Sequence, residues 1–132
     1  MASADEVSAA PPAVPADLAR EPVCYLETTG RVSGRPHEIE IWFVAEGSTI
    51  YMLSGGGYGA DWVKNLQTTP RVRVRIGDRT FAGSARVLAG ESDELHARQL
   101  VAAKYYGWRE GALPNDWARE ALPVAIRLDG RP

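Results

Sequence analysis

Residues 26–76 carry most of the signals for the fold: LETTGRVSGRPHEIEIWFVAEGSTIYMLSGGGYGADWVKNLQTTPRVRVRI. Residues 37–44 and 71–76 alternate polar and apolar side chains, and this alternation is typical of half-buried strands. A Glu-Gly-Ser turn at 46–48 then predicts a hairpin that returns as a strand over 49–53. Two strand segments around a tight turn therefore place most of this run in an antiparallel sheet.

One short helix interrupts these strands. Residues 61–67 place Trp62, Val63 and Leu66 on one side of a helix. Pro70 disfavours helical backbone at the residue before it and so ends the segment. The sequence therefore predicts a short helix inserted between two strands.

The flanking sequence adds three strands and a longer helix. Strands are expected over 23–28, 79–88 and 123–128. A helix begins at 92–94, where a capping side chain precedes acidic residues, and a short helical turn follows at 114–117. One face of the long helix carries Ala97, Leu100, Val101, Tyr105 and Trp108. Many strands with few helices predict a mainly β (α+β) fold, a small barrel or closed sheet.

Composition excludes several function classes. The chain has 132 residues, a net charge of −2 and a pI near 5.7, which give no general attraction to nucleic acid. Its one cysteine, Cys24, lies in a strand-like run and is interpreted as a buried structural thiol. His37 and His96 match no zinc spacing, so no metal site is expected.

The N-terminal residues form a separate region. Residues 1–16 are rich in Ala, Ser and Pro and are expected to be disordered. They lack the basic and apolar segments of a secretory signal, and no stretch approaches 18 apolar residues. We therefore expect a soluble cytoplasmic protein without a membrane span, with a single domain over 17–132.

Two glycine-rich turns flank the hairpin and suggest a binding site. Residues 28–35 combine glycines, hydroxyls and two guanidiniums, so this turn can surround an anion with backbone N–H donors and positive charge. Residues 54–57, Ser-Gly-Gly-Gly, form the second turn. The pattern is typical of a cofactor cleft.

These spaced elements resemble the deazaflavin-dependent nitroreductase family. The resemblance rests on Thr28-Thr29-Gly30-Arg31-x-Ser33-Gly34-x-Pro36, on Ser54-Gly-Gly, and on Trp62-x-x-Asn65-Leu66-x-x-x-Pro70 followed by alternating valines, and it covers roughly residues 22–128. It implies a split β-barrel of the FMN-binding type, with a short inserted helix and one longer C-terminal helix. It also implies the deazaflavin coenzyme F420, which behaves as a hydride carrier.

The resemblance further implies site residues. The turn at 31–33 would hold the phosphate and acidic tail of the coenzyme, and the strand from His37 would lie along its ring. Residues 52–55 would face the reactive edge, and Ser54, Tyr105 and Trp108 would be the catalytic, substrate-side residues, with Tyr106 as a substitute for either aromatic. The complete expected coenzyme set is Arg31, Val32, Ser33, Arg35, His37, Glu38, Ile39, Glu40, Ile41, Trp42, Met52, Leu53, Ser54, Gly55, Asp61, Trp62, Val63, Lys64 and Asn65.

Some residues depart from the family or have a plainer interpretation. The family often has Lys where Val32 and Gly55 stand, which leaves Arg31, Arg35 and Lys64 to compensate. The three arginines 71, 73 and 75 could form a solvated face paired with Glu38 or Glu40, a contact to the coenzyme tail or partner, or a nucleic-acid stripe. Trp62 and the late aromatic residues could equally be ordinary core packing.

The resemblance thus implies an enzyme that transfers a hydride between F420 and a small conjugated, quinone-like or nitroaromatic acceptor. A donor for the developing negative charge is required, and Ser54 or Tyr105 could supply it. Two alternatives stay open: an FMN-dependent oxidoreductase of the same fold, and a non-catalytic protein that binds the cofactor or another ligand. The expected assembly is a monomer or a homodimer.

Overall fold

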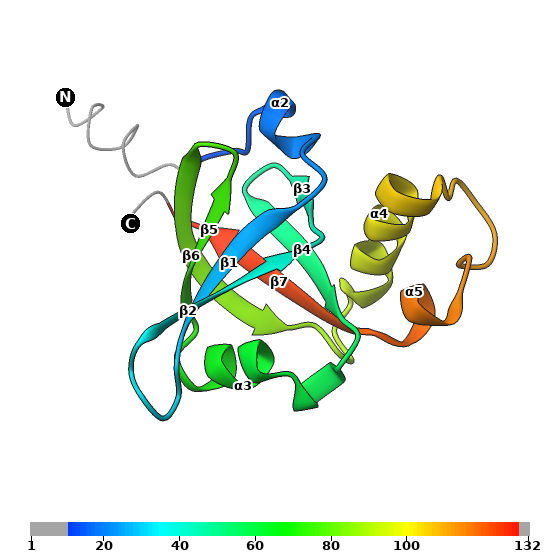
Figure 1. Ribbon diagram of the computed structural model, residues 1–132. Helices are drawn as coiled ribbons and strands as arrows, with labels where there is room; N and C mark the ends of the chain where they lie inside the picture. Colours follow the sequence, from blue (N-terminus) through cyan, green and yellow to red (C-terminus); the bar gives the residue numbers. More distant parts are fainter. Residues whose placement is uncertain (1–10, 130–132) are drawn as a thin grey trace.

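The computed structural model describes residues 11–129, and its main element is one antiparallel sheet of seven strands (Figure 1). The order across the sheet is β2-β1-β5-β6-β7-β4-β3, so β2 and β3 are the two edges. The strands are β1 (Cys24–Thr29), β2 (Pro36–Ile41), β3 (Val44–Glu46), β4 (Thr49–Ser54), β5 (Arg71–Ile76), β6 (Arg79–Val87) and β7 (Leu122–Leu128). The sheet curls into an open barrel, which confirms the expected mainly β class.

Four α-helices surround this sheet within the described residues. The α3 helix (Asp61–Thr68) closes one end of the curled sheet, where it contacts β1 and β6. The α4 helix (Glu94–Tyr106) packs on β4, β7 and β3, and α5 (Asp116–Glu120) packs on α4. The short α2 helix (Ala16–Ala19) precedes β1, and a 3-10 turn, η1 (Gly57–Gly59), precedes α3.

The main core fills the inside of the curled sheet. Leu26, Met52, Val74 and Ile126 are each fully buried in it. The opposite face of β4 is also buried, because Tyr51 and Leu53 pack under α4. Burial on both faces explains why residues 50–53 of β4 are all apolar and do not alternate.

The structure has two strands where one continuous strand was expected over 37–44. β2 ends at Ile41 and β3 begins at Val44, because Phe43 turns its side chain into the core. The backbone N–H of Phe43 donates to Tyr105 Oη at 2.9 Å, and its carbonyl accepts from Lys104 Nζ at 2.9 Å. Side chains from α4 replace the sheet hydrogen bonds at this residue. The prediction of one continuous strand over 37–44 was therefore wrong.

The late helix also ends earlier than its apolar pattern predicts. α4 stops at Tyr106, and Gly107 adopts a left-handed conformation with φ of 69° that glycine accommodates easily. Trp108 therefore does not lie on the helical face with Ala97 and Val101, as expected, but in the following loop.

The alternating arginines of β5 face outward, as predicted from their spacing. Arg75 pairs with Glu38 at 3.4 Å and lies over the ring of Tyr25. Glu40 instead accepts a hydrogen bond from Tyr25 Oη at 3.2 Å. The observed pairing supports the interpretation of this stripe as a solvated sheet face.

The expected disordered tail lies partly outside the described residues, which begin at residue 11. Within the described part, the Val14 N–H donates to Gly47 O at 3.1 Å, and Val14 packs against the core. None of the helices between residues 11 and 129 is long and apolar enough to cross a membrane. The same residues contain no group of His, Cys, Asp or Glu side chains that could hold a metal ion.

Candidate functional site

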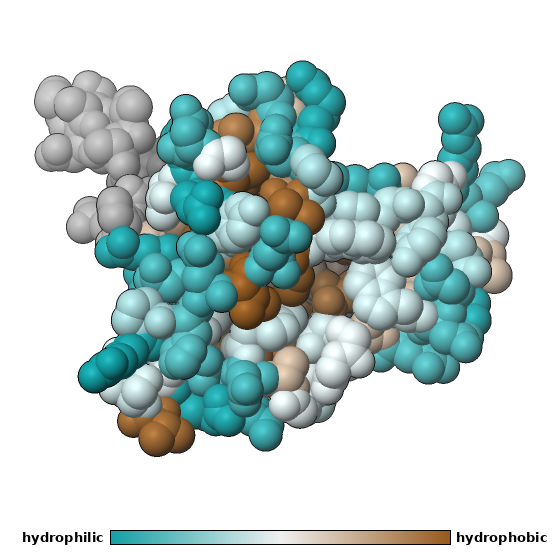
Figure 2. Space-filling model, in the orientation of Figure 1, coloured by the Kyte–Doolittle hydropathy of each residue, from teal (hydrophilic) through white to brown (hydrophobic). Residues whose placement is uncertain are grey.

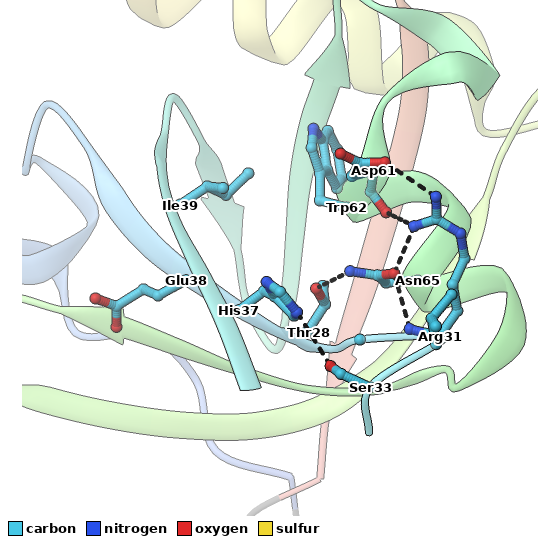
Figure 3. A pocket seen from close by; sticks show the side chains of 11 residues that line it. Thr28, Arg31, Ser33, His37, Glu38, Ile39, Asp61, Trp62 and Asn65 are labelled. Carbon is cyan, nitrogen blue, oxygen red and sulfur yellow. Dashed lines mark hydrogen bonds and ion pairs between the residues drawn. The ribbon is translucent and has the colours of Figure 1, made fainter. Parts of the chain in front are cut away.

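A cleft of about 450 Å³ opens between the free edge of β2 and the helix α3 (Figure 3). On the space-filling surface, apolar side chains gather in the middle of one face among hydrophilic ones (Figure 2). Three segments distant in sequence form the cleft: the glycine-rich turn, β2 and the first turns of α3. Its lining residues are Thr28, Gly30, Arg31, Val32, Ser33, His37, Glu38, Ile39, Asp61, Trp62 and Asn65.

The glycine-rich turn is closed by its own hydrogen bonds. Gly30 N–H donates to Arg35 O at 2.7 Å, and Gly34 N–H donates back to Gly30 O at 2.8 Å. Among the described residues, no acceptor is found for the amides of Val32 and Ser33. These two backbone donors are therefore available to a ligand in the cleft.

A buried amide fixes this turn to α3. Asn65, which is 3% exposed, accepts hydrogen bonds from the Arg31 backbone N–H and guanidinium, and its own amide donates to Thr28 Oγ1 at 3.1 Å. The Arg31 guanidinium also pairs with the Asp61 carboxylate at 3.0 Å (Figure 3). The Arg31 side chain is thus held in one direction and remains 31% exposed.

The start of α3 provides further donors. Ala60 is the N-cap, and no side chain accepts hydrogen bonds from the first N–H groups of the helix. Uncapped helix N-termini attract anions through their N–H groups and the helix dipole. Arg31 is the positive side chain in the lining, whereas Glu38 and Asp61 are negative. Anion binding there depends on backbone donors and on Arg31, because the lining carries no net positive charge.

The apolar part of the cleft lies between Ile39 and Trp62, which stand on opposite sides (Figure 3). Trp62 is partly buried and also packs against the main core, so it combines the two roles considered for it. At the polar end, Ser33 Oγ lies 3.5 Å from His37 Nε2 and accepts a hydrogen bond from the Arg35 N–H. The cleft therefore suits a ligand with one flat apolar part and one anionic part.

A second pocket, of about 420 Å³, lies further along β2 and is lined by an aromatic cup of Trp42, Tyr106 and Trp117. Trp42 meets Trp117 edge to face, with ring centroids 5.6 Å apart, and Tyr106 lies 6.1 Å from Trp42. Both Trp42 and Tyr106 remain more than two-fifths exposed, at 41% and 44%. The remaining lining residues are Val23, Glu40, Ile41 and Leu53.

Tyr105 lies behind this cup and has a structural role. Its ring stacks on Trp42 with centroids 4.2 Å apart, and its hydroxyl has Pro22 O at 2.8 Å and Phe43 O at 2.9 Å as acceptors for its proton. Burial raises the pKa of Tyr105 to about 12, against the smaller lowering effect of the Phe43 hydrogen bond. Because its proton is already donated within the protein, Tyr105 does not fit the expected role of donor to a substrate.

The hydroxyl of Ser54 likewise donates its hydrogen bond within the protein. It is 2% exposed, and its hydroxyl donates to Gly57 O at 3.1 Å, which closes the second glycine-rich turn. Trp108 donates its Nε1–H to Gly111 O in the loop after α4 and lines neither pocket. The three residues expected to be catalytic are therefore not brought together in the structure.

The expected coenzyme residues separate into groups. Nine of them line the cleft, and Asn65 among them is the buried amide that joins the turn to α3: Arg31, Val32, Ser33, His37, Glu38, Ile39, Asp61, Trp62 and Asn65. Four others line the second pocket instead: Glu40, Ile41, Trp42 and Leu53. Met52 and Val63 are fully buried and line neither pocket, because each points to the inner side of its element. Arg35 and Lys64 are exposed outside both linings.

Trp117, which lines the second pocket, was not predicted from the sequence. It was assigned only to a short helical turn, and no local pattern links it to Trp42, which lies across the fold. The buried hydroxyl of Thr28 was noted only as part of the motif, although it accepts from Asn65. Trp117 also lies beside Gly55, where a Cβ would be 3.3 Å from Trp117 Nε1, and this contact too exists only in the folded chain, so no sequence signal could have found it.

With this geometry established, comparison with known families gives a match over most of the chain. A family model described as F420H(2)-dependent quinone reductase matches residues 6–128. The match includes both glycine-rich turns, α3 and all seven strands.

Solved structures with similar folds extend this finding. A Bacteroides thetaiotaomicron protein assigned to 5-nitroimidazole antibiotic resistance has a TM-score of 0.69 and 16% identity, over 85% of this chain and 75% of that one. An F420-H2-dependent reductase has a TM-score of 0.60 and 22% identity, over 80% and 94% of the two chains. An F420 reductase has a TM-score of 0.57 and 21% identity, over 87% and 95%. These similarities confirm the expected split β-barrel fold.

Proposed function

This chain belongs to the F420H(2)-dependent quinone reductase family, and we propose that it transfers a hydride from reduced F420, held between β2 and α3, to a small quinone-like acceptor. The family identifies the enzyme as an oxidoreductase and its coenzyme as F420. The position of the coenzyme, the residues that hold it and the acceptor class are the parts that we propose.

The observation that carries the proposal is the arrangement of donors at the polar end of the cleft. Val32 and Ser33, whose amides have no partner among the described residues, line the same cleft as Arg31 and the first residues of α3, Asp61 and Trp62. Backbone donors and a fixed guanidinium are a common arrangement for phosphate. The phosphate of the coenzyme fits this end without a further lysine, which supports binding despite Val32 standing where the family often has Lys.

The other end of the cleft suits the ring system. Ile39 and Trp62 supply two apolar walls, and Ile39 belongs to β2, an edge strand of the sheet. Pockets for flat cofactors combine apolar walls with a few polar groups that fix orientation. The residues present therefore fit a molecule with a flat ring and a phosphate.

When bound, the coenzyme supplies a hydride, and the hard chemistry is its own. The protein residues hold the ring in one orientation and keep water from it, since alignment of donor and acceptor lowers the barrier. The aromatic cup at the Ile41 end of β2 provides a second flat, apolar surface for an acceptor. Hydride transfer requires no general base, which agrees with the absence of a paired His and carboxylate within either lining.

The direct test is a fluorescence titration of the full chain with oxidised F420, with FMN in parallel. Saturable binding of F420, with weak or no binding of FMN, is the expected result. A quinone such as 2-methyl-1,4-naphthoquinone should then oxidise the reduced coenzyme only in the presence of the protein. Preference for FMN would assign the cleft to a flavin, and absence of binding by both would remove the proposal.

A further inference from the structure

One lysine of α4 holds the corner between β2 and β3 to the segment before β1. Lys104 Nζ donates to the backbone carbonyl of Phe43, in the corner, at 2.9 Å. It also donates to the carbonyls of Ala19 at 3.1 Å and Glu21 at 2.8 Å, in the segment before β1. An ammonium group has three N–H donors, and these carbonyls use all of them. Lys104 therefore joins three segments that are distant in the sequence.

The neighbouring Tyr105 cannot replace these bonds. Its hydroxyl has a single proton, and two carbonyls lie within reach of it, Pro22 O at 2.8 Å and Phe43 O at 2.9 Å. When this proton is donated to Pro22, Lys104 is the donor that remains for the Phe43 carbonyl. The corner therefore depends on Lys104 in either arrangement of the Tyr105 proton.

The ammonium lies where burial makes its charge unfavourable. Burial lowers the pKa of Lys104 from its ordinary value, and Nζ lies 3.8 Å from the centre of the Phe43 ring. Removing a charge from water is costly unless hydrogen bonds compensate for it. An apolar side chain would avoid this cost and would pack equally well, but it would supply no donor to the carbonyls. The ammonium is therefore explained by the backbone groups that it holds.

The corner held by Lys104 carries Trp42, which lines the second pocket. Trp42 directly precedes Phe43, and its ring stacks on Tyr105 with centroids 4.2 Å apart and planes 3° apart. Two consecutive residues of one helix thus hold the Trp42 ring and the backbone of the next residue. Because Trp42 remains 41% exposed, its orientation depends on these contacts more than on surrounding core.

We propose that Lys104 is a positioning residue for hydride transfer, which fixes the corner at Phe43 and thereby the orientation of Trp42 at the second pocket. This inference rests on the proposed function, in which that pocket receives the acceptor. Lys104 lines neither the cleft nor the second pocket, so it acts through Trp42. Small displacements of the groups that orient two reactants lower the rate of their reaction strongly.

The first measurement needs no coenzyme. The full chain has four tryptophans, and fluorotryptophan labelling gives each of them a fluorine NMR signal. The Trp42 signal is identified by its loss in Trp42→Phe. Lys104→Met keeps an apolar stem and removes the ammonium. We expect it to shift or broaden the Trp42 signal and to leave the Trp62 signal, from α3, as in wild type. An unchanged Trp42 signal would overturn the inference.

Steady-state turnover of reduced F420 with 2-methyl-1,4-naphthoquinone separates positioning from stability. A variant that is only less stable contains less active enzyme, which lowers the apparent kcat and leaves KM unchanged. Lys104→Met should instead raise KM for the quinone about tenfold and change the Kd for F420 about twofold or less. Arg109→Met removes an exposed cation from the loop after α4 and is the matched control, which should change neither value.

Added propylammonium tests the hydrogen bonds themselves. Lys104→Ala lacks the stem and the ammonium group, and this ion supplies both, so it can donate to the same carbonyls. Propylammonium should return KM toward the wild-type value. Tetramethylammonium has the same charge and no N–H, and it should not. Lys104→Gln, which keeps N–H donors without the charge, should give an intermediate KM.

The outcomes distinguish this inference from the proposed function. Wild-type turnover together with an unchanged KM in Lys104→Met, or equal recovery of Lys104→Ala with the two ions, would overturn the role of Lys104 alone. Lys104 variants that fold neither alone nor with propylammonium would show a role in stability only and would overturn it as well. Failure of wild type to bind F420 would instead overturn the proposed function and, with it, the role in hydride transfer.

Discussion

The side-chain oxygen of Asn65 accepts two hydrogen bonds from Arg31, one from its backbone N–H at 3.1 Å and one from its guanidinium at 2.9 Å. Asn65 lies on α3, and Arg31 lies 34 residues earlier in the glycine-rich turn. One buried amide therefore joins the turn to the helix. It also determines where the free amides of Val32 and Ser33 lie relative to the start of α3.

Asn65→Ala should weaken both the fold and F420 binding. The substitution leaves the buried Thr28 hydroxyl and the Arg31 N–H without their partner, which costs roughly 1–3 kcal/mol in the free energy of unfolding. Denaturant unfolding and the coenzyme titration measure the two effects. Gln67→Ala, an exposed position on the same helix, is the control and should change neither. An Asn65→Ala protein with unchanged Kd would show that the clamp is purely structural.

Arg31→Ala should weaken coenzyme binding, because it removes a charge-assisted contact of roughly 1.5–3 kcal/mol. Arg109→Ala removes an exposed guanidinium from the loop after α4 and serves as the comparison. Fluorescence titration of both variants with oxidised F420 measures the difference. Equal dissociation constants for wild type and Arg31→Ala would exclude a role of Arg31 in phosphate binding.

Ser54→Ala should lower stability and leave turnover largely intact. The Ser54 hydroxyl donates to Gly57 O, so its removal costs roughly 0.5–1.5 kcal/mol of unfolding free energy. We expect kcat with 2-methyl-1,4-naphthoquinone to change about twofold or less. A large loss of kcat with unchanged coenzyme binding would instead return Ser54 to the acceptor side.

Stability should fall at alkaline pH, partly through Tyr105. Burial raises the pKa of Tyr105 from 10.0 to about 12, so below pH 10 both folded and unfolded states keep the proton and the contribution is complete. Between these two values the unfolded state binds fewer protons, and the free energy of unfolding decreases as pH rises. Urea unfolding across this window should give a shallower decline for Tyr105→Phe than for wild type. Tyr58→Phe, at an exposed position, should retain the wild-type slope.

Gly83→Ala should destabilise the sheet. A Cβ at this position in β6 would lie 2.3 Å from the Arg127 carbonyl oxygen of β7, and the neighbouring strand has to move to admit it. Overpacking of this kind costs roughly 1–3 kcal/mol. Thermal or denaturant unfolding measures the change. Gly90→Ala is an informative comparison, because that glycine has positive φ but no neighbour within 4 Å.

The sequence predicted the strands and α3 closely, because their signals are local. The alternation over 71–76 corresponds to β5 without a shift, and the predicted 61–67 helix differs from α3 by one residue. The predicted continuous strand over 37–44 was wrong at Phe43. Tyr105 and Lys104 of α4, which lie 62 and 61 positions later in the chain, bind the backbone of Phe43 instead. No local pattern carries such a contact.

The candidate site was likewise predicted only in part from the sequence. The motif around Arg31, Ser33, Trp62 and Asn65 was identified from spacing, and those residues do meet in one cleft. The acceptor-side residues were assigned by type, as hydroxyls and aromatic rings in suitable places. Whether a hydroxyl is free depends on its neighbours, and both Ser54 and Tyr105 donate to backbone carbonyls instead.

Periodicity, glycine positions and motif spacing are properties of the chain alone, so the mainly β fold, the two glycine-rich turns and the family could be predicted from them. The folded chain alone shows which polar groups have a partner: within residues 11–129 the amides of Val32 and Ser33 have none, whereas the hydroxyls of Ser54 and Tyr105 donate to backbone carbonyls. Hydrogen-bond partners from distant segments occupy most polar groups when the chain folds. Those left without a partner are defined only by the packing of the whole molecule.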